Sequence, residues 1–438
     1  MSLLFLSGLF LCLAAAYWPA GGLFFRNDDW VYIARIQHSL ERMRATNFAQ
    51  YFFNDVLPDH DFIRHFHPLS LLFLFGKYAF FRVNYRLHSG VSLVLHFICA
   101  LLIHTLVLRL TGSREAAALA ATLFAMNGFL ADTLLWAGQA SFILITLLSL
   151  ATLNLHPNLG QQGGVATLAF YAFNFLAPLI FEFGFFANGL SILLFLVPGP
   201  ASVVGAAGLV LFVCGHLYLR HLSSGLPRHA FFVGAGQLVK NVIWGLGKIC
   251  FGFAGNLPRT LVSDTLYLLG PRLGWSLAGL PLWGVVLGAG NVVKSPGSVT
   301  PYIALCLLLV ACAPFVVISF AMDESNPNPD LANQMPRYMH LGAALLAVVA
   351  GFAFGMLDFP SWGLPVLLVW TVGSGFASVR AQIAMVKPHT EAMRRDVECL
   401  RQTGTLPKRG PYHGNPHNYR LDWSFTLKNV QAYLRMEQ

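Results

Sequence analysis

Two adjacent carboxylates, Asp28 and Asp29, follow directly after the first hydrophobic segment of this 438-residue chain. Acids at the mouth of a membrane helix are costly, so their presence indicates a functional role. One of them can act as a general base at the membrane surface, and the second can raise its pKa or help to hold a divalent cation. The alternative is that Asn27 caps a helix whose positive end favours both acids.

Two further acids, Asp132 and Glu182, are isolated in apolar stretches. Acids within membrane spans are rare and usually face a cavity or a partner. We therefore expect both to face an outer cavity. A boundary position close to an arginine is the alternative for each.

The polar insert 26–68 contains a second group of ionisable side chains, which could supply oxygen and nitrogen ligands to a divalent metal. Its members are Asp59, His60, Asp61, Arg64, His65 and His67. No spacing among them is diagnostic of a metal site, so a solvated loop is the simpler interpretation.

Arg337 and Tyr338 precede a late hydrophobic segment. A guanidinium binds phosphate in a bidentate manner, so an arginine beside an aromatic ring at headgroup level can clamp a lipid phosphate. An aromatic-belt anchor is the alternative.

Three histidines, His88, His96 and His104, recur at steps of eight residues along the second predicted span. Each step rotates by about 80° around an α-helix, so the three do not share one face. A ladder of metal ligands is therefore not expected. Anchoring at the membrane interface explains Tyr85 and Arg86, which begin this span.

The composition places these residues in an integral membrane protein. Only 11% of the residues are charged, against about 25% in soluble domains, and the mean hydropathy is +0.61. The seven cysteines form no CxxC pair, so neither a zinc site nor a disulfide framework is indicated. The net charge of +9 is interpreted as loop charge close to lipid, with no nucleic-acid partner.

Hydrophobic segments predict about eleven spans of roughly 20 residues each. They are 3–25, 87–108, 115–135, 138–155, 165–181, 185–198, 201–219, 274–291, 301–321, 339–357 and 361–380. The first is interpreted as a retained helix because it is too long for a signal-peptide core. Residues 69–81 are predicted to be interfacial or re-entrant, and residues 230–255 to lie on the membrane surface.

Basic loops set the expected orientation. Arg109 and Arg114 flank a tight loop after the second span, which favours a cytoplasmic position and places the insert 26–68 outside. Residues 322–338 then also lie outside. The basic residues after the last span favour a cytoplasmic C-terminal tail. An odd number of spans instead places that tail outside. The sequence therefore does not decide on which side of the membrane the tail lies.

The order of these features resembles the GT-C superfamily of polytopic glycosyltransferases, in particular the protein O-mannosyltransferase-like and tetratricopeptide-linked branches. The resemblance covers about residues 1–380 and depends on the combination of motifs. It implies an all-α polytopic membrane domain at 1–385, with a large first outer loop that contains interfacial helices and a late outer loop at 322–338. Residues 386–438 form a polar C-terminal tail.

The resemblance also implies roles for individual residues. Asp28 or Asp29 would be the base or the metal anchor, and Asp132, followed by Trp136, would match the acid of the second outer loop. Substrate-binding positions would further include Glu182, Arg64, His67, Arg337 and Tyr338. The donor would be a sugar on a polyprenyl phosphate, transferred to an acceptor at the outer face of a membrane, expected to be the bacterial inner membrane.

The sequence departs from the family pattern at several positions. His67 stands where many relatives have arginine, Phe181 where they often have lysine, and Asn127-Gly128 where many have proline. No tetratricopeptide repeats follow residue 380. These departures favour an alternative, a non-catalytic GT-C-like scaffold subunit with a protein partner.

A transporter is a third possibility. Transporters typically show two related halves with interrupted helices, and the sequence contains no such halves. A Gly-rich nucleotide loop is also absent, which disfavours a soluble nucleotide-sugar donor. A glycosyltransferase is the favoured prediction.

Overall fold

The computed structural model describes residues 2–26, 29–45, 68–159, 163–181, 183–195, 202–224, 339–355, 362–406 and 426–437, with a few single positions between 242 and 311. Every regular element in these ranges is a helix. The elements are α1 (Ser2–Tyr17), η1 (Trp18–Gly22), α2 (Asp29–Ala45), α4 (Pro68–Phe81), α5 (Tyr85–Thr111), α6 (Arg114–Ala125), η3 (Gly128–Leu130), α7 (Ala131–Leu134), η4 (Ala137–Gln139), α8 (Ala140–Leu155), η5 (Pro157–Leu159), α9 (Gly164–Ile180), α10 (Gly184–Phe195), α11 (Ser202–Ser224), α16 (His340–Gly355), α17 (Gly363–Thr403) and α18 (Leu427–Glu437).

Five helical segments in the described part are long and apolar enough to cross a membrane. They are Leu3–Gly22, Tyr85–Thr111, Arg114–Leu134, Ala137–Leu155 and Gly363–Thr403. The prediction of an all-helical integral membrane protein is thus confirmed, whereas the count of about eleven spans is not. The predicted span 274–291 and nearly all of the predicted surface stretch 230–255 lie outside the described residues.

Local signals explain the bounds of α5, the longest helix in the bundle centre. Its first turn is capped by the side chain of Asn84, which accepts a hydrogen bond from the backbone N–H of Leu87. It ends at Gly112, whose φ of 69° is the left-handed conformation that glycine adopts without strain. Its 27 residues span about 40 Å at 1.5 Å per residue.

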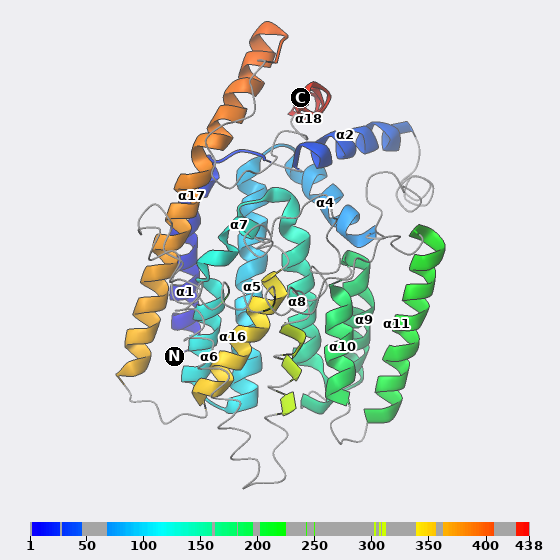
Figure 1. Cartoon of the computed structure of the whole chain (residues 1–438), viewed down its shortest axis with the longest axis vertical. Coiled ribbons are helices and arrows are strands. Elements are labelled where there is room, and N and C mark those ends of the chain that lie inside the picture. Colours follow the sequence, from blue (N-terminus) through cyan, green and yellow to red (C-terminus); the bar gives the residue numbers. More distant parts are fainter. Residues whose placement is uncertain are drawn as a thin grey trace.

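Helix α16 lies in the middle of the bundle, packed against α5, α6 and α8 (Figure 1). Small residues allow this close packing, as is usual between membrane helices. A Cβ atom added at Gly351 would lie 2.7 Å from the Cβ of Ala120 on α6. The inner part of the protein is therefore rigid and closely packed around α16.

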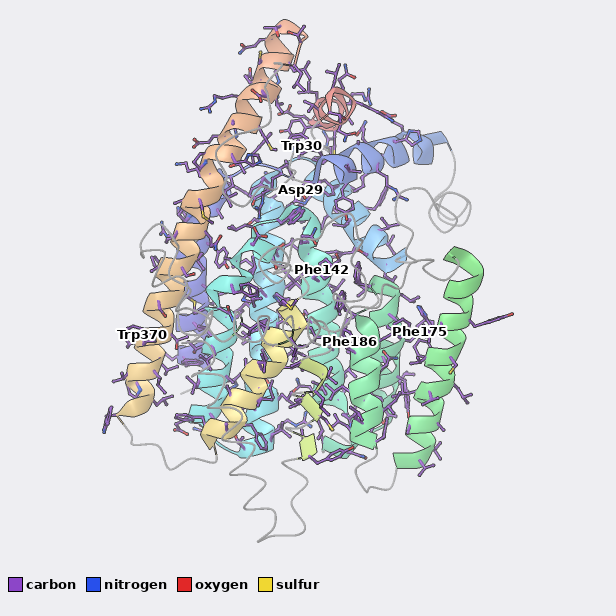
Figure 2. All side chains as sticks on the ribbon, viewed as in Figure 1. Asp29, Trp30, Phe142, Phe175, Phe186 and Trp370 are labelled. Carbon is purple, nitrogen blue, oxygen red and sulfur yellow. The ribbon has the colours of Figure 1, made fainter. Side chains whose placement is uncertain are left out.

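The outer surface of the bundle is apolar. Trp370, on the outward face of α17, is 63% exposed, and Phe175 on α9 faces α11, where its ring centroid lies 4.9 Å from that of Phe212 (Figure 2). Exposed aromatic and aliphatic side chains of this kind match a lipid environment.

Helix α17 is one continuous helix of 41 residues, so the predicted boundary between a membrane domain and a tail at residue 385 falls inside it. Its second half extends past the bundle on the side that carries α2 (Figure 1). Arg380 and Arg394, which follow the last predicted span, donate to backbone carbonyls of Ala15 and Leu23. Their positive charges therefore serve contacts within the protein.

The C-terminal helix α18 returns to the bundle and packs on α2 (Figure 1). Val430, Tyr433 and Met436 are spaced by three residues, so they share one face, and all three are buried. The ring of Tyr433 lies 5.5 Å from the ring of Trp30. Helix α18 thus lies on the same side of the bundle as α2.

Candidate functional site

The helix α2 begins at Asp29, as the spacing of apolar residues after Asn27 predicts. Trp30, Ile33 and Ile36 on its inner face are buried, at the helical spacing expected. Asp29 itself is completely buried. The insert 26–68 therefore starts with a helix that is fixed to the bundle.

Both carboxylate oxygens of Asp29 accept backbone hydrogen bonds. Oδ2 accepts from the N–H of Arg26 at 3.1 Å, which closes the turn before α2. Oδ1 accepts from the N–H of Gly138 at 2.7 Å; Gly138 belongs to the second loop, residues 127–139. The side chain thus joins two loops that are far apart in the sequence.

Gly138 is a position at which only glycine fits. A Cβ atom there would lie 2.9 Å from Oδ1 of Asp29 and 2.9 Å from the ring of Tyr32. Contacts this short do not occur without displacement of the neighbours, so the absence of a side chain at Gly138 is what allows Asp29 to approach the loop. Nothing in the sequence alone singles out this glycine.

Burial raises the pKa of Asp29 to about 7, because an ionised carboxylate loses its hydration there. The two backbone N–H groups and the charges of Arg26 and Lys77 act in the opposite direction. Desolvation outweighs them, so Asp29 is partly protonated near neutral pH.

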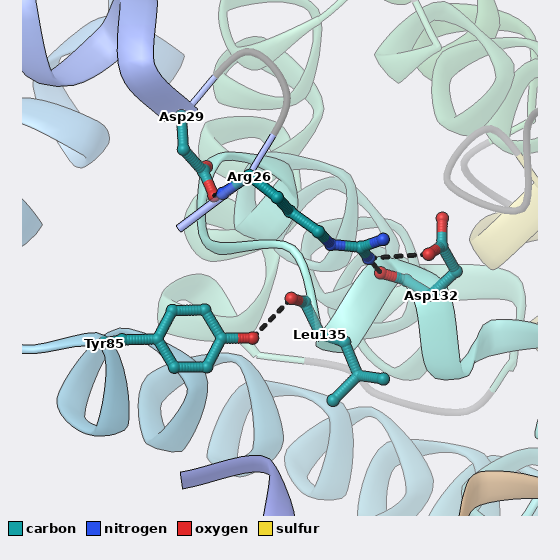
Figure 3. A network of polar contacts seen from close by, with 5 residues as sticks. All are labelled: Arg26, Asp29, Tyr85, Asp132 and Leu135. Carbon is teal, nitrogen blue, oxygen red and sulfur yellow. Dashed lines mark hydrogen bonds and ion pairs between the residues drawn. The ribbon is translucent and has the colours of Figure 1, made fainter. Parts of the chain in front are cut away.

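Asp132, in α7, forms an ion pair with Arg26. Nη2 of Arg26 lies 2.6 Å from Oδ1 of Asp132 and also donates to its backbone carbonyl at 3.2 Å (Figure 3). The two side chains are 6% and 16% exposed. This is the arginine neighbour that the alternative interpretation of Asp132 required.

Trp136 also contacts Arg26. The guanidinium carbon lies 5.6 Å from the centroid of the Trp136 ring, within the range of a cation–π interaction. The structure thus brings Asp132 and Trp136 to the start of the insert through one arginine. Sequence reasoning missed Arg26, although it directly precedes the Asn27-Asp28-Asp29 motif.

Two further side chains form hydrogen bonds with backbone carbonyls of the second loop. Tyr85 donates to the carbonyl of Leu135 at 2.5 Å (Figure 3), and Nζ of Lys77 donates to the carbonyl of Ala137 at 2.9 Å. Tyr85 is buried, and Nε of Arg86 donates to the carbonyl of Gly21. The explanation of Tyr85 as an interfacial anchor is therefore wrong, because its hydroxyl binds a loop inside the protein.

Several predicted site residues lie outside the described part of the chain. They are Asp28, Arg64, His67, Glu182, Arg337 and Tyr338, together with the Asp59-His60-Asp61 group. Their proposed roles remain predictions.

The surroundings of Asp29 do not suit a divalent cation. Both of its carboxylate oxygens already accept backbone N–H groups, and the neighbouring Arg26 guanidinium would repel a cation. Among the described residues, no group of three or more His, Cys, Asp or Glu side chains could hold a metal ion. We therefore assign no metal to Asp29.

No family model and no curated protein matches this sequence. Two solved structures resemble the fold. The apo structure of ArnT from Cupriavidus metallidurans matches with a TM-score of 0.48 and 12% identity, covering 98% of this chain and 84% of that one. The apo oligosaccharyltransferase from Archaeoglobus fulgidus matches with a TM-score of 0.51 and 13% identity, covering 98% of this chain and 63% of that one.

The likeness to the oligosaccharyltransferase concerns the fold alone. It is consistent with the GT-C-like fold that the resemblance implies. The O-mannosyltransferase-like branch is not confirmed.

Proposed function

We propose that this protein is a glycosyltransferase that moves a sugar from a polyprenyl-phosphate donor to an acceptor at the outer face of the membrane. The observation that carries the proposal is the meeting of two loops that bear acids. Asp29 accepts from Gly138, and Arg26 pairs with Asp132, so residues about a hundred positions apart form one polar site. The sugar, the lipid and the acceptor are not specified by these contacts.

The described geometry gives one of the two adjacent acids, Asp29, a structural role. A general base must lie within hydrogen-bond reach of the proton that it removes. Asp29 is completely buried and both of its oxygens accept backbone N–H groups, so it supports the loops. We therefore assign the base to Asp28, which precedes it.

The proposed reaction is a direct displacement. The acceptor oxygen attacks the anomeric carbon and loses its proton to the carboxylate of Asp28. The bond between that carbon and the phosphate oxygen breaks, and the lipid phosphate leaves with the electron pair. Arg337, beside Tyr338, stabilises the phosphate charge. Trp136, Glu182, Arg64 and His67 are proposed to bind the substrates.

A scaffold subunit is the second candidate. The observation in its favour is that both described acids of the site, Asp29 and Asp132, are already engaged by groups of the protein. In that case Asp28 would have no chemical role, and its substitution would not alter any transfer found in the purified complex.

The test is transfer from a panel of undecaprenyl-phosphate hexoses and pentoses by the purified full-length protein. Native cell membranes supply the acceptor, and released undecaprenyl phosphate is quantified by mass spectrometry. Asp28→Asn should lower kcat by about 10²–10⁴-fold, because the base is lost. Glu115→Gln changes an exposed acid of α6 and should retain full activity as a matched control.

Full activity in Asp28→Asn would refute the assignment of the base. Release of no undecaprenyl phosphate from any donor in the panel, by wild-type protein with verified folding, would favour the scaffold.

A further inference from the structure

A proline interrupts the hydrogen bonding at the end of α1. In an α-helix the carbonyl of Ala15 accepts from the N–H four residues later, but that residue is Pro19, which has no N–H. The chain continues as the short helix η1, whose last two residues are glycines. Carbonyl groups that lack α-helical donors therefore gather here, where the candidate membrane span Leu3–Gly22 ends.

Two arginines of α17 supply donors to these carbonyls. Helix α17 lies beside α1 (Figure 1). Nη2 of Arg380 donates to the carbonyl of Ala15 at 3.1 Å. Nη2 of Arg394 donates to the carbonyls of Gly22 at 3.0 Å and Leu23 at 2.9 Å. The end of α1 is thus held to α17 by two cations that bind neutral groups.

A third arginine approaches from α5. Nε of Arg86 donates to the carbonyl of Gly21 at 3.0 Å. A Cβ atom on Gly21 would lie 3.0 Å from this nitrogen, so the missing side chain leaves room for the arginine. Arg86, Arg380 and Arg394 are all exposed, and no acid in the described part of the chain pairs with them. A carbonyl carries no net charge, so three positive charges remain uncompensated at the surface.

A stripe of basic residues on α17 ends at this point. Its members recur at steps of seven and are Arg380, Lys387, Arg394 and Arg401. Seven residues complete almost two helical turns, so the four side chains share one face. Arg401, the farthest from α1, pairs with Glu398 at 2.6 Å and with Glu437 of α18. Acids therefore neutralise the far end of the stripe, whereas carbonyls bind the arginines close to α1.

Lys387 lies between these two situations. Its Nζ is 3.7 Å from Oε1 of Glu391, and its side chain is 58% exposed. Exposed ion pairs of this kind are weak. Four exposed cations thus surround the end of α1, and we call them the basic collar: Arg86, Arg380, Lys387 and Arg394.

The basic collar lies at the level of the lipid headgroups. Arg380 comes 17 residues after Gly363, the first residue of α17. At 1.5 Å per residue this is about 26 Å, close to the roughly 30 Å of a bilayer's hydrocarbon core. Trp18, at the end of α1, is 83% exposed, as is typical of tryptophans at a membrane–water interface. Lipid phosphates are therefore the anions that surround the collar.

We propose that the basic collar is a binding site for the phosphate groups of anionic phospholipids. Each arginine donates to the backbone from a single nitrogen, so its other N–H groups remain for lipid oxygens. A zwitterionic headgroup carries its own ammonium, so a cluster of cations favours an anionic lipid. The bound lipid joins α1, α5 and α17 at the membrane surface. This inference is independent of the proposed glycosyl transfer.

Native mass spectrometry of the full-length protein tests the site. The purified protein is mixed with equal amounts of dioleoyl phosphatidylglycerol and dioleoyl phosphatidylcholine, and the wild type should retain the anionic lipid. Lys387→Gln removes one charge and breaks only an exposed ion pair, so the preference for phosphatidylglycerol should fall about fivefold. Arg380→Gln should also lower it, whereas Arg380→Lys keeps the charge and should retain most of the preference.

Two further variants of α17 are matched controls. Arg401→Gln changes the net charge by the same amount on the same face, but acids already neutralise this arginine, so the preference should not change. Glu391→Gln removes the acid that pairs with Lys387 and should raise the preference for phosphatidylglycerol. Thermal unfolding of each variant verifies that it is folded.

Several results would contradict the proposal. Equal retention of the two lipids by the wild type would overturn it, as would an unchanged preference in both Lys387→Gln and Arg380→Gln. A loss in Arg401→Gln as large as that in Lys387→Gln would show that net charge alone attracts the lipid, without a site. Displacement of phosphatidylglycerol by an equal amount of undecaprenyl phosphate would overturn the choice of lipid and assign the collar to the lipid of the proposed donor.

Discussion

Asp29 and Asp132 are carboxylates at the same face of the bundle, and the protein treats them differently. Asp132 pairs directly with the guanidinium of Arg26, a cation at every accessible pH. Among the described residues, the hydrogen-bond partners of Asp29 are two backbone N–H groups, and its burial raises its pKa to about 7. Two acids at the same face of the bundle therefore differ in their partners: Asp132 is held by a cation, whereas Asp29 is held by backbone dipoles.

The largest effect should follow from breaking the ion pair. Arg26→Met leaves Asp132 buried without a cation, which should lower the free energy of unfolding by about 3–5 kcal/mol. Chemical unfolding in detergent measures it. Arg435→Met is the control, since Arg435 and Glu41 form an exposed pair with N···O at 3.6 Å, and such pairs contribute about 0–1 kcal/mol. Equal effects of the two variants would contradict a structural role for the buried pair.

A smaller effect is expected where Asp29 meets the second loop. Gly138→Ala forces a Cβ atom against Oδ1 of Asp29 and the ring of Tyr32, at a cost of about 1–3 kcal/mol. It should also impair transfer, because the two loops separate. Gly189→Ala is the control, as a Cβ atom there meets no atom within 4 Å and improves helix propensity. Thermal unfolding and donor turnover are the measurements, and a Gly138→Ala protein as stable and active as Gly189→Ala would contradict this contact.

The smallest change concerns the pH dependence of stability. The unfolded carboxyl of Asp29 ionises near pH 4, whereas the folded one keeps its proton until about pH 7. In this window the folded state binds more protons, so the contribution of Asp29 to stability falls as pH rises from 4 to 7. Asp29→Asn should remove this slope and lose one backbone hydrogen bond, about 0.5–1.5 kcal/mol. Unfolding at several pH values measures both, and an unchanged slope would refute the raised pKa.

Composition and hydropathy correctly predicted an all-helical membrane protein, because a chain that crosses lipid must satisfy its backbone hydrogen bonds within long apolar helices. The helix that follows Asn27 was also predicted, since Trp30, Ile33 and Ile36 recur with helical spacing. These are local properties, and each can be recognised within a few residues of sequence.

The contacts that build the site could not be predicted in this way. Arg26 and Asp132 are separated by 106 residues, so their pairing depends on how η1 and α7 both pack against α5. Gly138 carries no side chain, so nothing in the sequence marks it as the place where Asp29 enters the loop. The contacts of Arg380 and Arg394 with the backbone carbonyls of Ala15 and Leu23 could not be predicted either, because each joins residues more than 360 positions apart.

The packing of α18 on α2 has a consequence for biosynthesis. α2 is made early in synthesis, whereas α18 is made only after α17. At roughly 5–20 residues per second, this interval is on the order of tens of seconds. During that time the face of α2 that carries Trp30 lacks the cover of Tyr433. A nascent chain thus forms α2 long before the helix that packs on it, and a ribosome that stalls before α18 leaves a protein in which α2 lacks this cover.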